Sequence, residues 1–505
     1  MIKKNEFKSE WTKQDAFKSV LWFVLHYFLF IALAVVLLFG DKITAIGQYL
    51  SKYGADYLYA VSCILMLFVI TYLYFLFENR EVLKKGKSIT LIFTILDIYL
   101  VLALMIGYKM NIYARPVALV ALLILILLGR RDAIFMNMIC ALLVFMIDTF
   151  AMPDVTAKES YSALIIAFSA GMFAIFLGGR VRTRIRVMGI GIAIVLPIEV
   201  VIGLLGMSGF VPGAETVVAT QPDTAQTMFL QMGYGLFGGV ASTILFLALL
   251  PILEGIFNCL TSFRLRELTS SDAKILRKLK AEAPGTYNHS VLVAQLAEAS
   301  AAAIGEDVDK ARAAALYHDV GKLHYPEHFT ENQGDYNLHD ELTPELSADI
   351  IRSHARDGYT LIKAHRLPEF LADIALEHHG TLPIRYFYAK ALKLTDGELN
   401  IEDFSYMGPK PQSKLAAIIM ICDASEAAVR AVGAKTPEET EKAIRGVIEE
   451  RMDLEQFAEC DVTMADLTKI RHALVSTLTG VYHHRIKYPN IKYRHTDSGM
   501  KGENE

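Results

Sequence analysis

The chain has 505 residues, of which 53% are hydrophobic and only 21% charged. Residues 1–262 contain 20 Lys and Arg and 16 Asp and Glu, whereas residues 263–505 contain 30 and 38, so a sparsely charged half of net charge +4 precedes a half of ordinary soluble composition and net charge −8. This division excludes a disordered chain, a collagen-like chain and a single soluble domain. The five cysteines are scattered without a CxxC pair, which indicates neither a disulfide framework nor a zinc ribbon.

Eight apolar segments in the first half are candidates for membrane spans, because a bilayer core needs roughly 20 apolar residues of helix. The shortest runs from Pro116 to Leu128. The predicted spans are 20–39, 57–77, 88–107, 116–128, 132–150, 161–178, 187–206 and 228–251.

The basic residues that flank these spans predict an orientation. With eight spans, 15 Lys and Arg fall in the flanks on one side and 5 in the flanks on the other. The positive-inside rule then places both ends of the apolar half in the cytoplasm. Losing one span would invert this alternation, so the charge pattern supports all eight.

Four carboxylates fall inside predicted spans, namely Asp97, Asp148, Glu199 and Glu254. Charge in hydrocarbon is costly, so we expect these side chains to face the bundle interior or to be protonated. Two interpretations stay open: a cavity that senses a ligand or protons, and interhelical hydrogen bonds that only hold the bundle together. A transporter is disfavoured, because the sequence shows no internal repeat.

The second half is predicted to be helical throughout. Helix starts recur at Thr343-Pro344 and at Thr436, where an N-cap, a proline at the first helical position and Glu439 form a capping box. No strand-like alternation of useful length appears, so the fold class is all-α. The predicted parts are a membrane domain (1–262), a helical linker (263–288), a soluble helical domain (289–489) and a disordered tail (490–505).

Residues of metal-ligand type recur through the soluble domain within short motifs. They are His289 in GTYNHS, His318 and Asp319 in YHDVGK, His354 in RSHARDG, His378 and His379 in EHHGT, and Asp423 in MICDASEA. Seven imidazole and carboxylate groups are too many for one ion and suit two metals that share a bridging carboxylate. Neighbours such as His318 and Asp319 point about 100° apart on a helix, so we expect them beside a helix end.

These motifs, together with ENQ at 331–333 and GPKPQSK at 408–414, closely resemble the HD-superfamily phosphohydrolases, of the type with a seven-transmembrane receptor and an intracellular HD domain (PgpH-like). The resemblance covers most of the chain from about residue 57. It implies a bacterial inner-membrane protein with a cytoplasmic HD domain that hydrolyses cyclic di-AMP, a signalling nucleotide, to linear pApA with two manganese or iron ions. Only about 17 residues (40–56) occupy the place where relatives carry an extracellular domain.

Carried over position by position, the resemblance implies that His289, His318, Asp319 and Asp423 serve one metal. Asp319 as the bridge, with His354, His378 and His379, would serve the other. Lys322 would contact a phosphate group beside the catalytic Asp319, and the aromatic Tyr386 is a candidate for stacking on a base. A homodimer is a further expectation of partnership, beside the lipid bilayer and the cyclic dinucleotide.

Several alternatives remain at this stage. The substrate could be cyclic di-GMP or another nucleotide, although the Gly-Tyr-Pro triplet typical of cyclic di-GMP relatives does not follow His379. A non-catalytic nucleotide receptor would predict a broken ligand set, and all seven residues are present. Specific nucleic-acid binding finds no support, since the soluble half is acidic and has no basic stripe.

Overall fold

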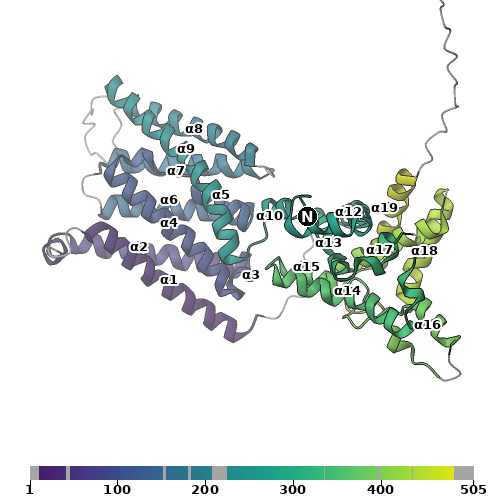
Figure 1. The fold of residues 1–505 in the computed structure, drawn as a ribbon. Coiled ribbons are helices and arrows are strands. Elements are labelled where there is room, and N and C mark those ends of the chain that lie inside the picture. Colours follow the sequence, from purple (N-terminus) through teal and green to yellow (C-terminus); the bar gives the residue numbers. More distant parts are fainter. Residues whose placement is uncertain are drawn as a thin grey trace, which may run out of the picture. The chain divides into compact units, whose positions relative to one another are not determined.

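A computed structural model describes residues 11–40, 46–151, 155–179, 184–207, 224–334, 336–394, 398–434 and 436–482. The chain divides into two compact units, Met1–Arg264 and Leu265–Glu505. The described residues form helices and no strand, apart from one isolated bridge between Pro383 and Ser405, which confirms the all-α fold class (Figure 1). The division lies two residues beyond the predicted one, and the predicted tail (490–505) lies outside the described residues.

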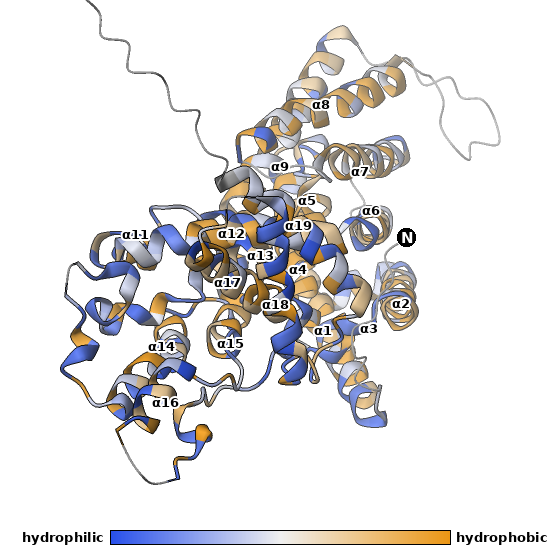
Figure 2. Cartoon of the chain, turned by 90° about the vertical axis from the view of Figure 1, so that its right-hand side faces the viewer, coloured by the Kyte–Doolittle hydropathy of each residue, from blue (hydrophilic) through white to orange (hydrophobic). Residues whose placement is uncertain are grey.

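The first unit contains seven helices that are long and apolar enough to cross a membrane. They are α1 (Lys13–Phe39), α2 (Ile46–Glu78), α4 (Gly86–Lys109), α6 (Arg130–Ala151), α7 (Ala157–Gly178), α8 (Arg184–Met207) and α9 (Ala225–Phe257). Hydrophobic residues dominate them, as Figure 2 shows by colour. Two further short helices are α3 (Arg80–Lys84) and α5 (Leu119–Leu127). The protein is therefore a multi-pass membrane protein.

The fourth predicted span, residues 116–128, is not a full transmembrane helix. Here the chain forms the 3-10 turn η2 (Ile112–Ala114) and then α5, whose nine residues rise only about 14 Å. Arg115 is extended (φ −63°, ψ 143°) because a residue before proline avoids the helical region. The helix within the predicted short span thus begins only at Leu119, because Pro116 keeps Arg115 extended.

Residues 110–129 nevertheless bring the chain back across the helical layer. Near the start of α6, Asp132 accepts hydrogen bonds from Tyr74 (3.1 Å) and Asn79 (2.8 Å) at the end of α2. Because α4 begins next to the end of α2 and runs away from it, the chain must return before α6 begins. Residues 110–129 therefore return the chain to the end of α2 where α6 begins, and the eight-pass topology stays a prediction.

Two of the four intramembrane carboxylates have partners in the bundle. Asp148 on α6 accepts two hydrogen bonds from the guanidinium of Arg115, at 2.5 and 2.8 Å, and both side chains are almost fully buried. Glu254 is buried on α9 and accepts a hydrogen bond from Thr261. By contrast, Oδ1 of Asp97 and both carboxylate oxygens of Glu199 are buried without a hydrogen-bond partner in the described part of the chain.

The Arg115–Asp148 pair provides a test of what holds the irregular fourth pass. Replacing Arg115 by methionine is expected to destabilise the membrane unit by about 3–5 kcal/mol, because Asp148 would stay buried without its partner. The double change R115M/D148L should recover most of this loss, since it removes both charges. Unfolding of the full chain in detergent measures both variants. An R115M variant as stable as the wild type would contradict this role for the ion pair.

The second unit is a helical domain whose first helices include the predicted linker. Its longer helices are α10 (Ser262–Leu268), α11 (Lys274–Glu282), α12 (Pro284–Ile304), α13 (Val308–Tyr317), α14 (Pro344–Ala364), α15 (Glu369–Glu377), α16 (Arg385–Leu392), α17 (Lys414–Val432), α18 (Pro437–Asp453) and α19 (Met464–Tyr482). Five short 3-10 turns lie between them, namely η3 (Val320–His324), η4 (Pro326–His328), η5 (Thr330–Asn332), η6 (Leu338–Asp340) and η7 (Ile401–Phe404). The expected capping box of Thr436 and Glu439 opens α18.

Small residues let the helices around the site approach one another closely. Alanines form much of the buried surface of α12 and α13, which pack together, and α12 also packs on α17 and α19. At Gly321 in η3, an added Cβ would lie 1.9 Å from the carbonyl oxygen of His354 in α14. Only glycine therefore lets the turn after Asp319 lie directly against the helix that carries His354.

Candidate metal centre

Five segments that are distant in the sequence carry the seven predicted ligand residues. His289 lies in the second turn of α12, His354 in the middle of α14 and Asp423 in α17. The two adjacent pairs lie at helix ends, as expected: His318 is the C-cap of α13 and is followed by Asp319 at the start of η3, and His378 is the C-cap of α15 and is followed by His379. A helix end turns the backbone, so both members of a pair can face one point.

Six of the seven residues form two groups that share Asp319. One group is His289, His318 and Asp319, and the other is Asp319, His354, His378 and His379. Oδ2 of Asp319 lies 3.2 Å from Nε2 of His318. Its other oxygen, Oδ1, lies 3.3 Å from Nε2 of His354 and 3.6 Å from that of His378. Each carboxylate oxygen thus faces a different set of imidazoles, as a bridging ligand requires.

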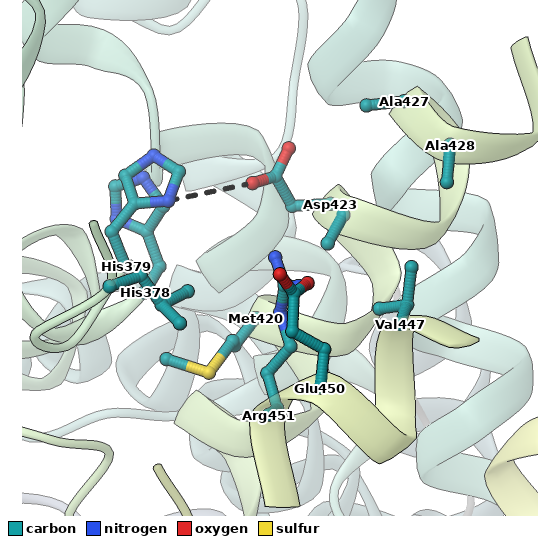
Figure 3. A pocket seen from close by; sticks show the side chains of 11 residues that line it. His378, His379, Met420, Asp423, Ala427, Ala428, Val447, Glu450 and Arg451 are labelled. Carbon is teal, nitrogen blue, oxygen red and sulfur yellow. Dashed lines mark hydrogen bonds and ion pairs between the residues drawn. The ribbon is translucent and has the colours of Figure 1, made fainter. Parts of the chain in front are cut away.

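Asp423 lies at the edge of both groups. Its Oδ1 is 3.0 Å from Nε2 of His289 and 3.9 Å from that of His318. Its Oδ2 is 4.0 Å from Nδ1 of His379 (Figure 3). The carboxylate is therefore within reach of the His289 group and faces the open side of His379.

Most of the imidazoles are oriented by a hydrogen bond at Nδ1. In His318, His354 and His378 this nitrogen lies 2.6, 2.5 and 2.8 Å from the carbonyl oxygen three residues earlier, so each Nε2 points towards Asp319. Nδ1 of His289 lies 2.9 Å from Oε2 of Glu426 instead. Such outer contacts fix the tautomer and ring orientation that a metal ligand needs.

Sequence reasoning missed Glu426. The signal was available, since Glu426 follows Asp423 by three residues on α17 and such positions share a helix face. Replacing Glu426 by glutamine is expected to weaken metal binding by about 10- to 100-fold, because His289 would lose its charged partner. Titration of the metal-free chain with Mn²⁺ measures this. Unchanged affinity would mean that Glu426 only fills space.

Tyr406 is the second residue that the sequence did not single out. Its ring stacks on His379 with a centroid distance of 4.2 Å and an interplanar angle of 24°, and it meets His354 edge-on at 5.9 Å. The imidazole ring of His379 makes no hydrogen bond to the described residues, and its Nδ1 lies 4.0 Å from Oδ2 of Asp423. An aromatic face therefore orients this imidazole where a hydrogen bond orients the others.

Lys322 is held by two carboxylates. Its ammonium lies 2.8 Å from Oδ2 of Asp319 and 2.8 Å from Oε1 of Glu331, and it stands over the ring of Phe329. Although burial opposes the charge, Asp319 and Glu331 raise the pKa of Lys322 above its usual value. Glu331 in turn accepts a hydrogen bond from Thr286 at the start of α12. The lysine thus stays charged at the centre of the cluster.

The donor set fits divalent metal ions. Nε2 of His318 and Oδ1 of Asp319 are buried polar atoms without a hydrogen-bond partner among the described residues. Buried groups of this kind need a partner, and both face the centre of the cluster. Neutral imidazole with carboxylate oxygen suits transition metals such as manganese, iron or zinc, and the donors alone do not choose among them.

The two histidine groups differ in how they hold protons. Burial opposes the charge of His318, but Asp319 raises its pKa to about 10, and hydrogen bonds to Asp423 and Glu426 raise that of His289 despite its burial. In the other group, burial lowers the pKa of His354 to about 3 and holds that of His379 well below its usual value. At neutral pH His318 is therefore protonated, whereas His354 is neutral.

This difference predicts that metal uptake by the two groups responds differently to pH. A metal ion needs unprotonated imidazole, so binding to the His289 group should release protons at pH 7 and should weaken as the pH falls below about 10. Binding by His354 should release no proton at pH 7, because its pKa of about 3 lies far below that pH. Calorimetry of the H354N and H289N variants in buffers of different ionisation enthalpy separates the two. Equal proton release would contradict the assignment.

A cavity of about 370 Å³ opens beside the cluster, within the size range of ligand pockets (Figure 3). Its lining residues are His378, His379, Leu382, Met420, Asp423, Ala424, Ala427, Ala428, Val447, Glu450 and Arg451. Tyr386, the predicted base-stacking residue, is exposed on α16 and does not line this cavity. Three of the predicted ligands, His378, His379 and Asp423, thus border the cavity, and the predicted stacking residue does not.

Comparisons with known proteins match both halves of the chain. The family described as HD domain matches residues 286–428, and the family described as 7TM receptor with intracellular HD hydrolase matches residues 55–261. The cyclic-di-AMP phosphodiesterase PgpH of Bacillus subtilis (strain 168) is 37% identical over 84% of this chain and 59% of its own length. PgpH of Listeria monocytogenes serotype 1/2a (strain 10403S) is 35% identical over 83% and 57%. The chain thus spans less than two thirds of the length of these relatives.

Two crystal structures are also similar to part of the chain. The HD domain of L. monocytogenes PgpH is 45% identical, with a TM-score of 0.40, over 42% of this chain and 100% of that one. The same domain in complex with cyclic-di-AMP is 47% identical, with a TM-score of 0.41, over 42% and 99%. The two family matches follow one another along the apolar and soluble halves, the resemblance of the motifs is confirmed, and the chain belongs to the family of seven-transmembrane receptors with an intracellular HD hydrolase domain.

Proposed function

We propose that this protein is a membrane-anchored phosphodiesterase that hydrolyses cyclic di-AMP to pApA at a centre for two manganese or iron ions. The observation that carries the proposal is the shared carboxylate of Asp319, whose two oxygens face two separate groups of histidines at 3.2 to 3.6 Å. Relatives of similar sequence are named cyclic-di-AMP phosphodiesterases, which supports the choice of substrate.

When bound, two divalent ions would activate water near neutral pH and offset the charge of the phosphodiester. His289, His318 and Asp423 would hold one ion and His354, His378 and His379 the other, with Asp319 between them. Glu426 orients His289, and Tyr406 orients His379. Lys322 keeps a positive charge beside Asp319, where it would favour a phosphate over a neutral ligand. The domain has net charge −8 and needs these cations to attract a dinucleotide.

The proposed orientation places the HD domain in the cytoplasm, where a signalling nucleotide is found. Eight passes would bring the beginning of α1 and the end of α9 to the same end of the bundle as the basic flanks at Arg80, Arg130 and Arg184. The positive-inside rule assigns that end to the cytoplasm.

The test uses the full chain in detergent with Mn²⁺ or Fe²⁺, assayed against cyclic di-AMP and cyclic di-GMP side by side. Selective production of pApA is the expected result. Preference for cyclic di-GMP would keep the chemistry and overturn the substrate. No hydrolysis of either nucleotide with both ions bound would leave the family's receptor role and refute the proposed activity.

A further inference from the structure

The cavity beside the metal centre has a cation on the wall away from the histidines. Arg451 lies on α18 and borders the same space as His378, His379 and Asp423, as Figure 3 shows. Its side chain is 14% exposed, so it is held within the cavity wall rather than in open solvent. Lys322, the other cation of the site, does not line the cavity and is fully engaged with Asp319 and Glu331.

Some hydrogen-bond donors of Arg451 have no acceptor among the described residues. Nη1 contacts Glu450, whose carboxylate is shared with Arg385 at 2.9 Å. Nε of Arg451 is buried without an acceptor, and no described residue accepts a hydrogen bond from Nη2. Two guanidinium groups therefore share the carboxylate of Glu450. A guanidinium with free donors suits a phosphate, which accepts such bonds through several oxygens.

The remaining wall leaves room for the body of a nucleotide. Ala424, Ala427 and Ala428 follow Asp423 on one face of α17, and Val447 faces the cavity from α18. Small apolar side chains next to a metal centre admit a ribose or a base without offering it a charge. The cavity thus runs from the metal ligands past an apolar surface to a cation.

We propose that Arg451 binds the second phosphodiester of a cyclic dinucleotide while the first lies at the metal centre. This proposal rests on the proposed function. Arg451 would distinguish a substrate with two phosphodiesters from a substrate with one. A cyclic dinucleotide carries its two phosphates on opposite sides of one ring, so a site that cleaves one must accommodate the other. Arg451 is the cation that lines the cavity among its bordering residues.

The test compares three substrates in the full chain with Mn²⁺. Cyclic di-AMP has two phosphodiesters, linear adenylyl-(3′→5′)-adenosine has both nucleosides and one phosphodiester, and bis(4-nitrophenyl) phosphate has one phosphodiester and no nucleoside. For R451Q we expect KM for cyclic di-AMP to rise by about 10- to 100-fold, the loss of a charged hydrogen bond. The other two substrates and the metal content should change by less than about twofold. R451K, which keeps the charge but not the planar fork, should fall between.

A matched control is Arg445→Gln on the same helix, whose side chain is half exposed and pairs with Glu441. Equal losses on all three substrates would show that Arg451 acts through the fold or the metal ligands and would overturn the proposal. A loss on both adenosine-containing substrates would assign Arg451 to a nucleoside and would also overturn it, as would no loss on any. If wild type cleaves bis(4-nitrophenyl) phosphate but not cyclic di-AMP, the proposed function itself fails.

Discussion

Replacing Asp319 by asparagine is expected to lower phosphodiester hydrolysis at least about a thousandfold and to remove both metal ions. Asparagine keeps the size of the side chain but loses the charge that both histidine groups and Lys322 face within 3.7 Å. Without that charge, the His354 group has no anionic ligand and the His289 group keeps only Asp423, while Lys322 stays buried with Glu331 as its remaining partner. Metal analysis of the purified chain and an assay with cyclic di-AMP measure both effects.

The control for this variant is Asp461→Asn, because Asp461 is exposed in the loop between α18 and α19. It should keep full activity and metal content. An Asp319 variant that retains two ions would show that the carboxylate is not the bridge. One that loses only one ion would assign Asp319 to a single group and would contradict the shared-ligand arrangement.

Removing one histidine from each group should produce two proteins that each keep a single ion. In the H289N variant we expect the His289 group to lose its ion, and in H354N the other group, so the metal content should fall from about two ions per chain to about one. Hydrolysis should nevertheless be lost in both, by about a hundredfold or more, since activation of water and charge neutralisation are divided between the ions.

His365→Asn is the matched control, since His365 is exposed at the end of α14, eleven residues after His354. Its metal content and activity should equal those of the wild type. If either ligand variant lost both ions, the two groups would form one cooperative site. If either kept full activity with one ion, a single-metal mechanism would replace the present one.

The sequence predicted the metal centre better than it predicted the details around it. The seven ligand residues occur in short motifs, and adjacent pairs such as His318 and Asp319 could be placed at helix ends from helix geometry alone. Glu426 and Tyr406 were missed because their roles depend on partners 137 and 27 residues away in the chain. Such contacts are made by tertiary packing and leave little local pattern.

In the membrane half, too, the sequence predicted the main helices better than the details between them. Apolar length predicted the seven long helices, whereas the parity inferred from charge alternation stays a prediction. The fourth pass differs because Pro116 keeps Arg115 extended, and Arg115 then turns inward to pair with Asp148. Arg115 is one of the five basic residues counted in the less basic flanks. An arginine beside a predicted span is normally expected in an exposed loop. Its burial depends on a carboxylate 33 residues further on.

The partnered carboxylates favour the structural interpretation for two of the four intramembrane acids. Asp148 and Glu254 are hydrogen bonded within the bundle, which accounts for their burial. Asp97 and Glu199 have buried oxygens without a hydrogen-bond partner among the described residues, so interhelical hydrogen bonding does not explain them. Hydrogen bonding within the bundle thus accounts for Asp148 and Glu254, whereas a cavity that senses a ligand or protons stays the open interpretation for Asp97 and Glu199.

The most direct test of the two-metal centre is a titration of the metal-free full chain with Mn²⁺, in which bound ions and hydrolysis of cyclic di-AMP are measured in the same samples. We predict that hydrolysis stays low while the first ion binds and rises with the second, because Asp319 brings both histidine groups to one substrate phosphate. Full hydrolysis with a single bound ion, or in the metal-free chain, would contradict the account.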